Sequence, residues 1–167
     1  VENHPDNPNG LDFIVYSNKF WIGGDPNYRW MEPALVEVSE DINGNGLADD
    51  PWYLMPGSRQ LARDVLPAGM TNPAPPLAGY VRNPNADGTE HDWGYAGMAP
   101  TLREYLDNYM RPDDPFTVGI TPRSGGGDAF DLAWAVNDAG QPAQLDQIHF
   151  VRLSAFIAGA AGPFGYV

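Results

Sequence analysis

Glycine and proline recur along the whole of this chain, and they set the strongest limit on its fold. The 167 residues include 19 glycines and 17 prolines. Proline ends helices and glycine weakens them, so this content leaves little room for long helices. Short strands joined by ordered turns fit better. Since 43% of the residues are hydrophobic, we expect one globular domain over residues 1–167 with a core of its own.

Hydrophobic alternation predicts several short strands. The expected strands cover residues 11–16, 34–39, 52–55, 128–136 and 148–154. Residues 128–136 form the strongest of them, and we expect residues 148–154 to be their antiparallel neighbour. Residues 101–110 begin with a capping box and are the one expected helix. Residues 17–30 and 67–88 are expected to be loops. The predicted class is mainly β, an antiparallel β-sandwich or jelly roll with long ordered loops and at most one or two short helices.

The charge balance excludes two classes of partner. There are 22 acidic and 9 basic residues, which gives a formal net charge of −13. Such a surface repels nucleic acids and anionic membranes, and no apolar run is long enough for membrane insertion. An acidic surface is compatible with the binding of divalent cations. The alternative is that the acidic residues only keep the protein soluble. The absence of cysteine excludes disulfides, zinc–thiolate sites and thiol nucleophiles.

An acidic loop over residues 41–50 carries the pattern of a calcium site. Residues 39–52 read SEDINGNGLADDPW. Oxygen-bearing side chains recur at Asp41, Asn43 and Asn45. Gly46 permits a sharp turn, Leu47 can offer its backbone carbonyl, and Asp49 follows. Alternate residues of a tightly wound loop point inward, and calcium takes roughly 6–8 oxygen ligands at about 2.3–2.6 Å.

The loop departs from the EF-hand pattern at its end. The bidentate glutamate of an EF-hand would fall at Trp52, which cannot bind a cation, and a strand precedes the loop in place of a helix. The missing ligand is expected from Asp50, from water or from a distant carboxylate. The carboxylates considered for this site, or for a second cation near residues 125–128, are Glu32, Glu37, Asp128 and Asp131. The alternative is an Asn-Gly turn between two strands that binds no ion.

Several motifs resemble those of a known class of exported protein. The loop is similar to the calcium loops of thrombospondin type 3 repeats and dockerins. The motifs GGDPN, DINGNGLADDPW and GGGDAFDLAWAV, with most of the chain around them, resemble a domain of bacterial cell-surface and exported proteins of planctomycete and Bacteroidetes type. The resemblance implies a secreted, extracellular β-sandwich with a structural or binding role and no enzymatic activity.

Compared with that family, the chain is expected to lack a glycine-rich segment and a strand before Val1. One explanation is strand exchange, in which a neighbouring subunit supplies the strand and self-association follows. The apolar tail, residues 155–167, is then the expected donor. The other explanation is an incomplete sequence.

Aromatic residues in expected loops suggest a second kind of ligand. They are Trp21, Tyr28, Trp30, Trp93 and Tyr95. Exposed aromatic rings stack on sugars, which would suit a carbohydrate-binding module. The alternative is that these rings cover the ends of the core, because aromatic side chains bury well.

The other sequence patterns give weaker evidence for a functional site. Residues 125–128 (GGGD) lack the ending of a phosphate loop, and the three histidines have no metal-ligand spacing. A hydrolase would need a cleft with two facing carboxylates.

The sequence favours a calcium-stabilised extracellular structural protein that is not an enzyme and forms a subunit of a filament or lattice. The alternative is a calcium-dependent carbohydrate-binding module.

Overall fold

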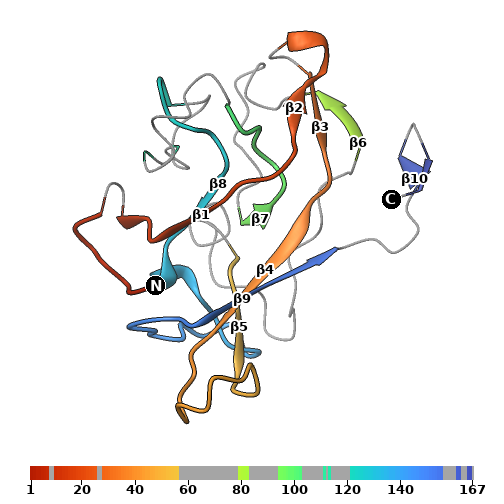
Figure 1. Ribbon diagram of the computed structural model, residues 1–167. Coiled ribbons are helices and arrows are strands. Elements are labelled where there is room, and N and C mark those ends of the chain that lie inside the picture. Colours follow the sequence, from red (N-terminus) through yellow and green to blue (C-terminus); the bar gives the residue numbers. More distant parts are fainter. Residues whose placement is uncertain are drawn as a thin grey trace.

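Short antiparallel strands make up almost all of the regular structure (Figure 1). A computed structural model describes residues 1–7, 10–25, 28–56, 79–82, 94–102, 111, 113, 121–155, 161–162 and 165–166. Within this part of the chain the helices are two 3₁₀ turns, η2 (Ile22–Gly24) and η5 (Leu132–Trp134). None of the helices described here has the length and apolar character needed to cross a bilayer.

The strands of the described residues form four antiparallel sheets. In chain order they are β1 (Phe13–Val15), β2 (Phe20–Trp21), β3 (Tyr28–Met31), β4 (Ala34–Ser39), β5 (Trp52–Leu54), β6 (Gly79–Arg82), β7 (Tyr95–Ala96), β8 (Asp128–Phe130), β9 (Phe150–Ala155), β10 (Ala161–Gly162) and β11 (Gly165–Tyr166). The largest sheet contains β5, β4, β7 and β9. The others are β2-β3-β6, β1-β8 and β10-β11.

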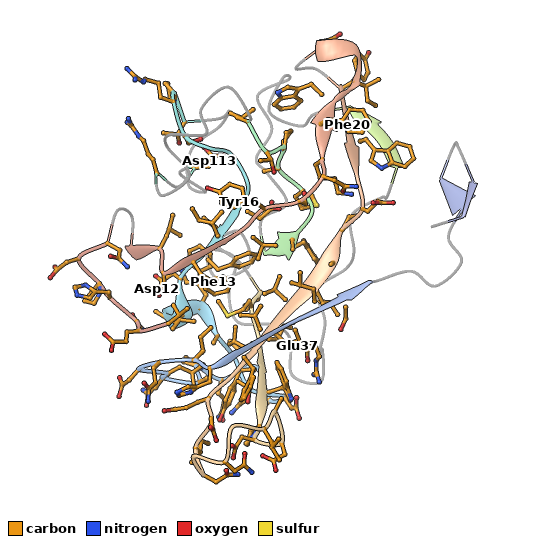
Figure 2. The ribbon with its side chains drawn as sticks, in the orientation of Figure 1. Asp12, Phe13, Tyr16, Phe20, Glu37 and Asp113 are labelled. Atoms are coloured by element: carbon orange, nitrogen blue, oxygen red, sulfur yellow. The ribbon has the colours of Figure 1, made fainter. Side chains whose placement is uncertain are left out.

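Strand β4 is the centre of the largest sheet. One of its edges pairs with β5 and β7, and the other pairs with β9 over its whole length, from Ala34 opposite Ala155 to Ser39 opposite Phe150. The predicted bounds and alternation of this strand are confirmed. Val36 and Val38 are fully buried, whereas Glu37 points away from them and forms an ion pair (Figure 2).

The main core lies on the Val36 face of β4. Its largest fully buried side chains include those of Met55, Phe130, Leu132 and Ile148. Phe13 on β1 stacks on Phe130 of β8 with ring centroids 5.1 Å apart. A smaller cluster lies on the other face, where Leu35 packs against Tyr95 and Met98. The sheet is therefore covered by apolar side chains on both faces at this end.

The strand predicted over residues 128–136 is correct only for its first third. β8 ends at Phe130 because the Asp131 carboxylate accepts a hydrogen bond from the Ala133 N–H at 2.8 Å, which starts η5. Leu132 and Trp134 are still buried, as the alternating pattern predicts. The predicted pairing with residues 148–154 is wrong, because β8 pairs with β1 and β9 pairs with β4.

Two predicted loops contain strands. β2 lies within residues 17–30, β3 begins in that segment at Tyr28 and ends just after it at Met31, and β6 lies within residues 67–88. Of the helix predicted over residues 101–110, the structure describes only Thr101 and Leu102, and Thr101 forms a β-bridge with Gly126. Of the tail, residues 161–162 and 165–166 pair with each other as β10 and β11.

Gly126 stands where two backbone segments meet most closely. It has a φ of 68°, and a Cβ at this position would collide with the carbonyl oxygen of Pro100. The neighbouring Gly127 N–H donates to that same carbonyl at 3.1 Å. Any side chain at Gly126 would therefore push residues 100–102 away from β8. Gly23 has a similar φ of 62°, but no atom lies within 4 Å of the position that a Cβ would take there.

We expect Gly126→Ala to destabilise the protein more than Gly23→Ala. Both changes place a methyl group at positive φ, at a cost of about 1–2 kcal/mol. Only Gly126→Ala adds overpacking, which costs about 1–3 kcal/mol more. Urea unfolding of both variants measures the difference. Equal losses would contradict the close approach of the Pro100 carbonyl.

Candidate metal centre

The acidic loop joins β4 to β5 and projects from the end of the sheet. Residues 42–49 are exposed to solvent, and even the apolar side chains of Ile42 and Leu47 are 62% and 60% exposed. Gly44 and Gly46 have φ values of 69° and 74°, which lets the chain wind tightly here. No packing against the core holds this loop, so its shape depends on its own polar contacts.

The first half of the loop is wound around the Asp41 carboxylate. One carboxylate oxygen accepts the Asn45 N–H at 3.0 Å, and the other accepts the Gly46 N–H at 2.8 Å. Asn43 Oδ1 also accepts the Asn45 N–H at 3.0 Å, and Asn45 Oδ1 accepts the Leu47 N–H at 2.7 Å. These side-chain oxygens therefore accept backbone N–H groups of the loop itself.

Asp49 closes the ring from the second half of the loop. Its carboxylate accepts the Nδ2 groups of Asn43 and Asn45 at 3.1–3.3 Å. The structure thus brings together four of the predicted ligands, Asp41, Asn43, Asn45 and Asp49. Amide N–H groups now partly neutralise Asp49. A half-turn of each amide about its terminal bond would turn oxygens toward Asp49, and it would also break the hydrogen bonds that the Oδ1 atoms accept from the Asn45 and Leu47 N–H groups.

Asp50 and His149 anchor the base of the loop. Asp50 Oδ2 accepts the Ile42 N–H at 3.0 Å, across the two ends of the loop. His149 Nδ1 accepts the Asp41 N–H at 3.0 Å from the segment that leads into β9. Asp50 therefore has a structural partner already. The sequence pattern carried no sign of the His149 contact, because the two residues are 108 positions apart.

The donor set of the loop suits a hard cation. It consists of carboxylate and amide oxygens together with the Leu47 carbonyl, and these are calcium ligands. Within the described residues, no three His, Asp or Glu side chains form a group that could hold a metal ion. A site here would therefore depend on the asparagine amides, on backbone oxygen and on water.

Glu32 forms an ion pair with a buried lysine. Its carboxylate contacts Lys19 Nζ at 3.0 Å, and the Lys19 side chain is 2% exposed. Burial lowers the pKa of Lys19, while the hydrogen bond and the charge of Glu32 raise it. Glu32 thus compensates the charge of Lys19 on the segment before β2 and does not join the loop.

Glu37 and Asp128 also have partners away from the loop. Glu37 forms a two-fold contact with the Arg152 guanidinium, at 2.8 Å for each bond, and that guanidinium lies 4.1 Å from the ring centroid of Trp52. Asp128 is buried, and its carboxylate accepts backbone N–H groups at 2.8–3.1 Å from three residues in a row. The donors are Gly97, Met98 and Ala99. Both carboxylates therefore hold strands together.

Asp131 caps η5 and lies near Asp12. Burial raises the pKa of Asp131, the hydrogen bond from Ala133 lowers it, and the charge of Asp12 raises it. Asp12 itself accepts the Leu132 N–H at 2.8 Å and the His4 N–H at 2.8 Å. The two carboxylates therefore serve turns at the N-terminal end of the core.

We expect Asp131→Asn to raise the melting temperature at pH 7. Asparagine can still accept the Ala133 N–H, and it removes a charge that burial and Asp12 disfavour. Because the folded-state pKa is raised, the wild-type protein is relatively most stable when Asp131 is protonated, and it loses that advantage as pH rises through the folded pKa. The gain should shrink toward acid pH in thermal melts, and a gain independent of pH would contradict this explanation.

The aromatic residues predicted to stack on sugars are dispersed. Tyr95 lies on β7 and is 3% exposed, so it belongs to the core and that prediction is wrong. Tyr28 and Trp30 are partly buried on β3, and Trp21 is on β2. Trp93 lies outside the described residues. Of this set, Trp21 lines a groove formed by described residues.

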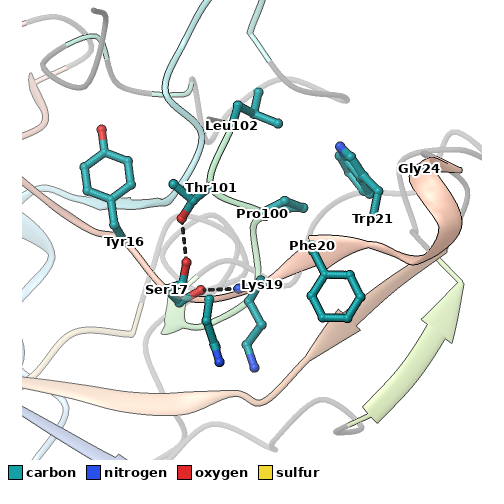
Figure 3. Close-up of a pocket in the computed structure, with 10 residues that line it drawn as sticks. Tyr16, Ser17, Lys19, Phe20, Trp21, Gly24, Pro100, Thr101 and Leu102 are labelled. Atoms are coloured by element: carbon teal, nitrogen blue, oxygen red, sulfur yellow. Dashed lines mark hydrogen bonds between the residues drawn. The ribbon is translucent and has the colours of Figure 1, made fainter. Parts of the chain in front are cut away.

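This groove lies between residues 16–21 and 100–102 and has a volume of about 660 Å³ (Figure 3). Tyr16 and Phe20 are 36% and 53% exposed along it, and the sequence had not marked either residue. The Thr101 hydroxyl donates to the Ser17 carbonyl at 2.6 Å and joins the two sides. Among the described residues, its lining contains no Asp or Glu, so it offers no carboxylate pair for glycoside hydrolysis.

Comparison with known proteins gives no family for this chain. No family model matches it, and no curated protein matches it in sequence.

Proposed function

We propose that this chain is a calcium-stabilised structural module of an exported cell-surface protein. In this proposal its antiparallel sheets belong to a β-sandwich or jelly roll, and the module serves as a subunit of a filament or lattice without enzymatic activity. The supporting observation is the convergence of Asp41, Asn43, Asn45 and Asp49 within one hydrogen-bonded loop.

The exposure of the loop explains why an ion would matter. Ile42 and Leu47 point to solvent, and the chain has no cysteine to provide a covalent link. Ordering each loop residue costs about 1–2 kcal/mol of conformational entropy. A cation held by oxygens from both halves of the loop would offset part of that cost. It would also fix the connection between β4 and β5.

The charge count sets the expected affinity. Asp41 and Asp49 are the two carboxylates within the ring, and Asp50 is bonded to the Ile42 N–H. With so few charges, the Kd for calcium should fall at roughly 10⁻⁴–10⁻³ M, the range of extracellular modules.

Calcium should raise the melting temperature of the purified protein. At about 100 times Kd, the free energy of unfolding should increase by about 2.7 kcal/mol. For a chain of this size that corresponds to roughly 5–11 °C. Thermal melts in calcium and in EGTA, at equal ionic strength, measure the shift, and equal melting temperatures would refute the proposal.

Asp49→Asn tests whether the loop holds the ion. We expect at least about a tenfold increase in the calcium Kd by calorimetry, because a ring carboxylate is lost. The matched control is Asp138→Asn, which removes an exposed acid from the turn after η5. Binding that weakens equally in both variants would point to general attraction by the negative surface.

The groove supports a second candidate function, the binding of a carbohydrate. Its rings, the exposed Tyr16 and Phe20 and the partly buried Trp21, can stack on sugar faces, and Asn18 and Thr101 can add polar contacts. Figure 1 has β2 and the β4–β5 loop at opposite ends of the molecule. Calcium bound in the loop would therefore not contact a sugar in this groove. It would affect sugar binding only by stabilising the fold.

Trp21→Ala should weaken binding to any soluble oligosaccharide that the protein retains, by about tenfold or more. Trp52→Ala is the control, because Trp52 contacts Arg152 at the other end of the protein. Screening on a glycan array, followed by calorimetry, supplies the measurement. A blank array in calcium, or equal effects of the two variants, would count against the groove.

A further inference from the structure

We infer that the outer edge of β9 is a docking edge for a second copy of this chain. Within the described residues, strand β9 pairs along one edge only, with β4. Val151 and Leu153 are 44% and 50% exposed, although they lie opposite the fully buried Val38 and Val36. These two side chains therefore extend the core face of the sheet beyond its last strand.

The hydrogen bonds of β4 show which backbone groups of β9 are free. The Val36 carbonyl accepts the Met55 N–H on the β5 side, so the amides and carbonyls of Glu37 and Ser39 point toward β9. Their register partners are Arg152 and Phe150. The groups of the alternate β9 residues must then point outward. They belong to Val151, Leu153 and Ala155.

A β-bulge sets where this free edge begins. Phe150 is the register partner of Ser39, and the His149 N–H also donates to the Ser39 carbonyl at 2.9 Å. Before the bulge the outer edge is already occupied. Val1 exchanges two hydrogen bonds with Ile148, at 2.7 and 2.9 Å. Past this point no strand in the described part of the chain pairs with the edge.

The charge of β9 favours a copy of this acidic protein at this place. At a net charge of −13, most faces of one molecule repel those of another. The sequence of β9, FVRLSA, contains no acidic residue. Its one charge, on Arg152, is paired with Glu37. Two β9 edges can therefore approach without bringing unpaired acids together.

The sequence of β9 also complements itself in antiparallel pairing. With Leu153 opposite its equivalent, Arg152 lies opposite Ser154, and the outward groups of Val151 meet those of Ala155. A register shifted by one residue per strand would place Arg152 opposite Arg152, where like charges repel. The favoured pair continues the sheet across a two-fold axis and brings the exposed Val151 and Leu153 side chains of both copies onto one face.

The contact is small, so the dimer should be weak, with a Kd of roughly 10⁻⁵–10⁻³ M. Sedimentation equilibrium in EGTA, at protein concentrations up to about 1 mM, measures it separately from calcium binding. Leu153→Lys should raise the Kd by at least about tenfold, because two lysines would face each other. Ile42→Lys adds the same charge at an exposed aliphatic residue off β9 that is not a proposed calcium ligand, and it should leave the Kd within about twofold.

Amide hydrogen exchange identifies the edge. In the dimer, the amides of Val151, Leu153 and Ala155 should become protected as protein concentration rises, whereas Arg152 and Ser154, which face β4, should not change. A monomer at all concentrations would overturn the inference. So would protection of the outward amides at every concentration, which would mean that another segment of the same chain covers them. A dimer without new protection there would place the contact on a different surface.

Discussion

The pairing of β4 on both edges is the constraint on which the other features depend. Glu37, in the middle of this strand, binds Arg152 from a position 115 residues away. The same strand buries Val36 and Val38 in the core and leads directly into the acidic loop. Without cysteine, this hydrogen-bonded ladder and the core beneath it must hold the early and late parts of the chain together.

Backbone N–H groups determine much of what the carboxylates do in this protein. Asp128 receives three of them in the interior, Asp41 receives two in solvent, and Asp131 receives one at the start of η5. An acid surrounded by donors in the core has no need of a cation. In the exposed loop, water competes with the carboxylates for the same N–H groups. A cation bound by these carboxylates can therefore add to the stability of the loop.

The sequence predicted the features that depend on near neighbours. The bounds of β4 follow from its alternation, and the winding of the loop follows from Asp41, Asn43 and Asn45, which lie two residues apart. It failed at β8, because an alternating pattern looks the same whether Leu132 is buried by a strand or by a 3₁₀ turn. The side chain of Asp131 makes that difference. The partners of Glu37 and Asp128, and the groove beside Phe20, arise from segments far apart in sequence, and local patterns carry no signal for them. Lys19 and Glu32 are 13 residues apart, and no periodic pattern links them.

The wide separation of β4 and β9 has a consequence for how the chain acquires its structure. On the ribosome, Glu37 of β4 emerges 115 residues before its partner Arg152 on β9. During that interval one edge of β4 lacks its native partner β9, which slows folding and favours association between nascent chains. The charged loop that follows β4 directly is then a gatekeeper, since its acids keep that edge soluble until β9 arrives.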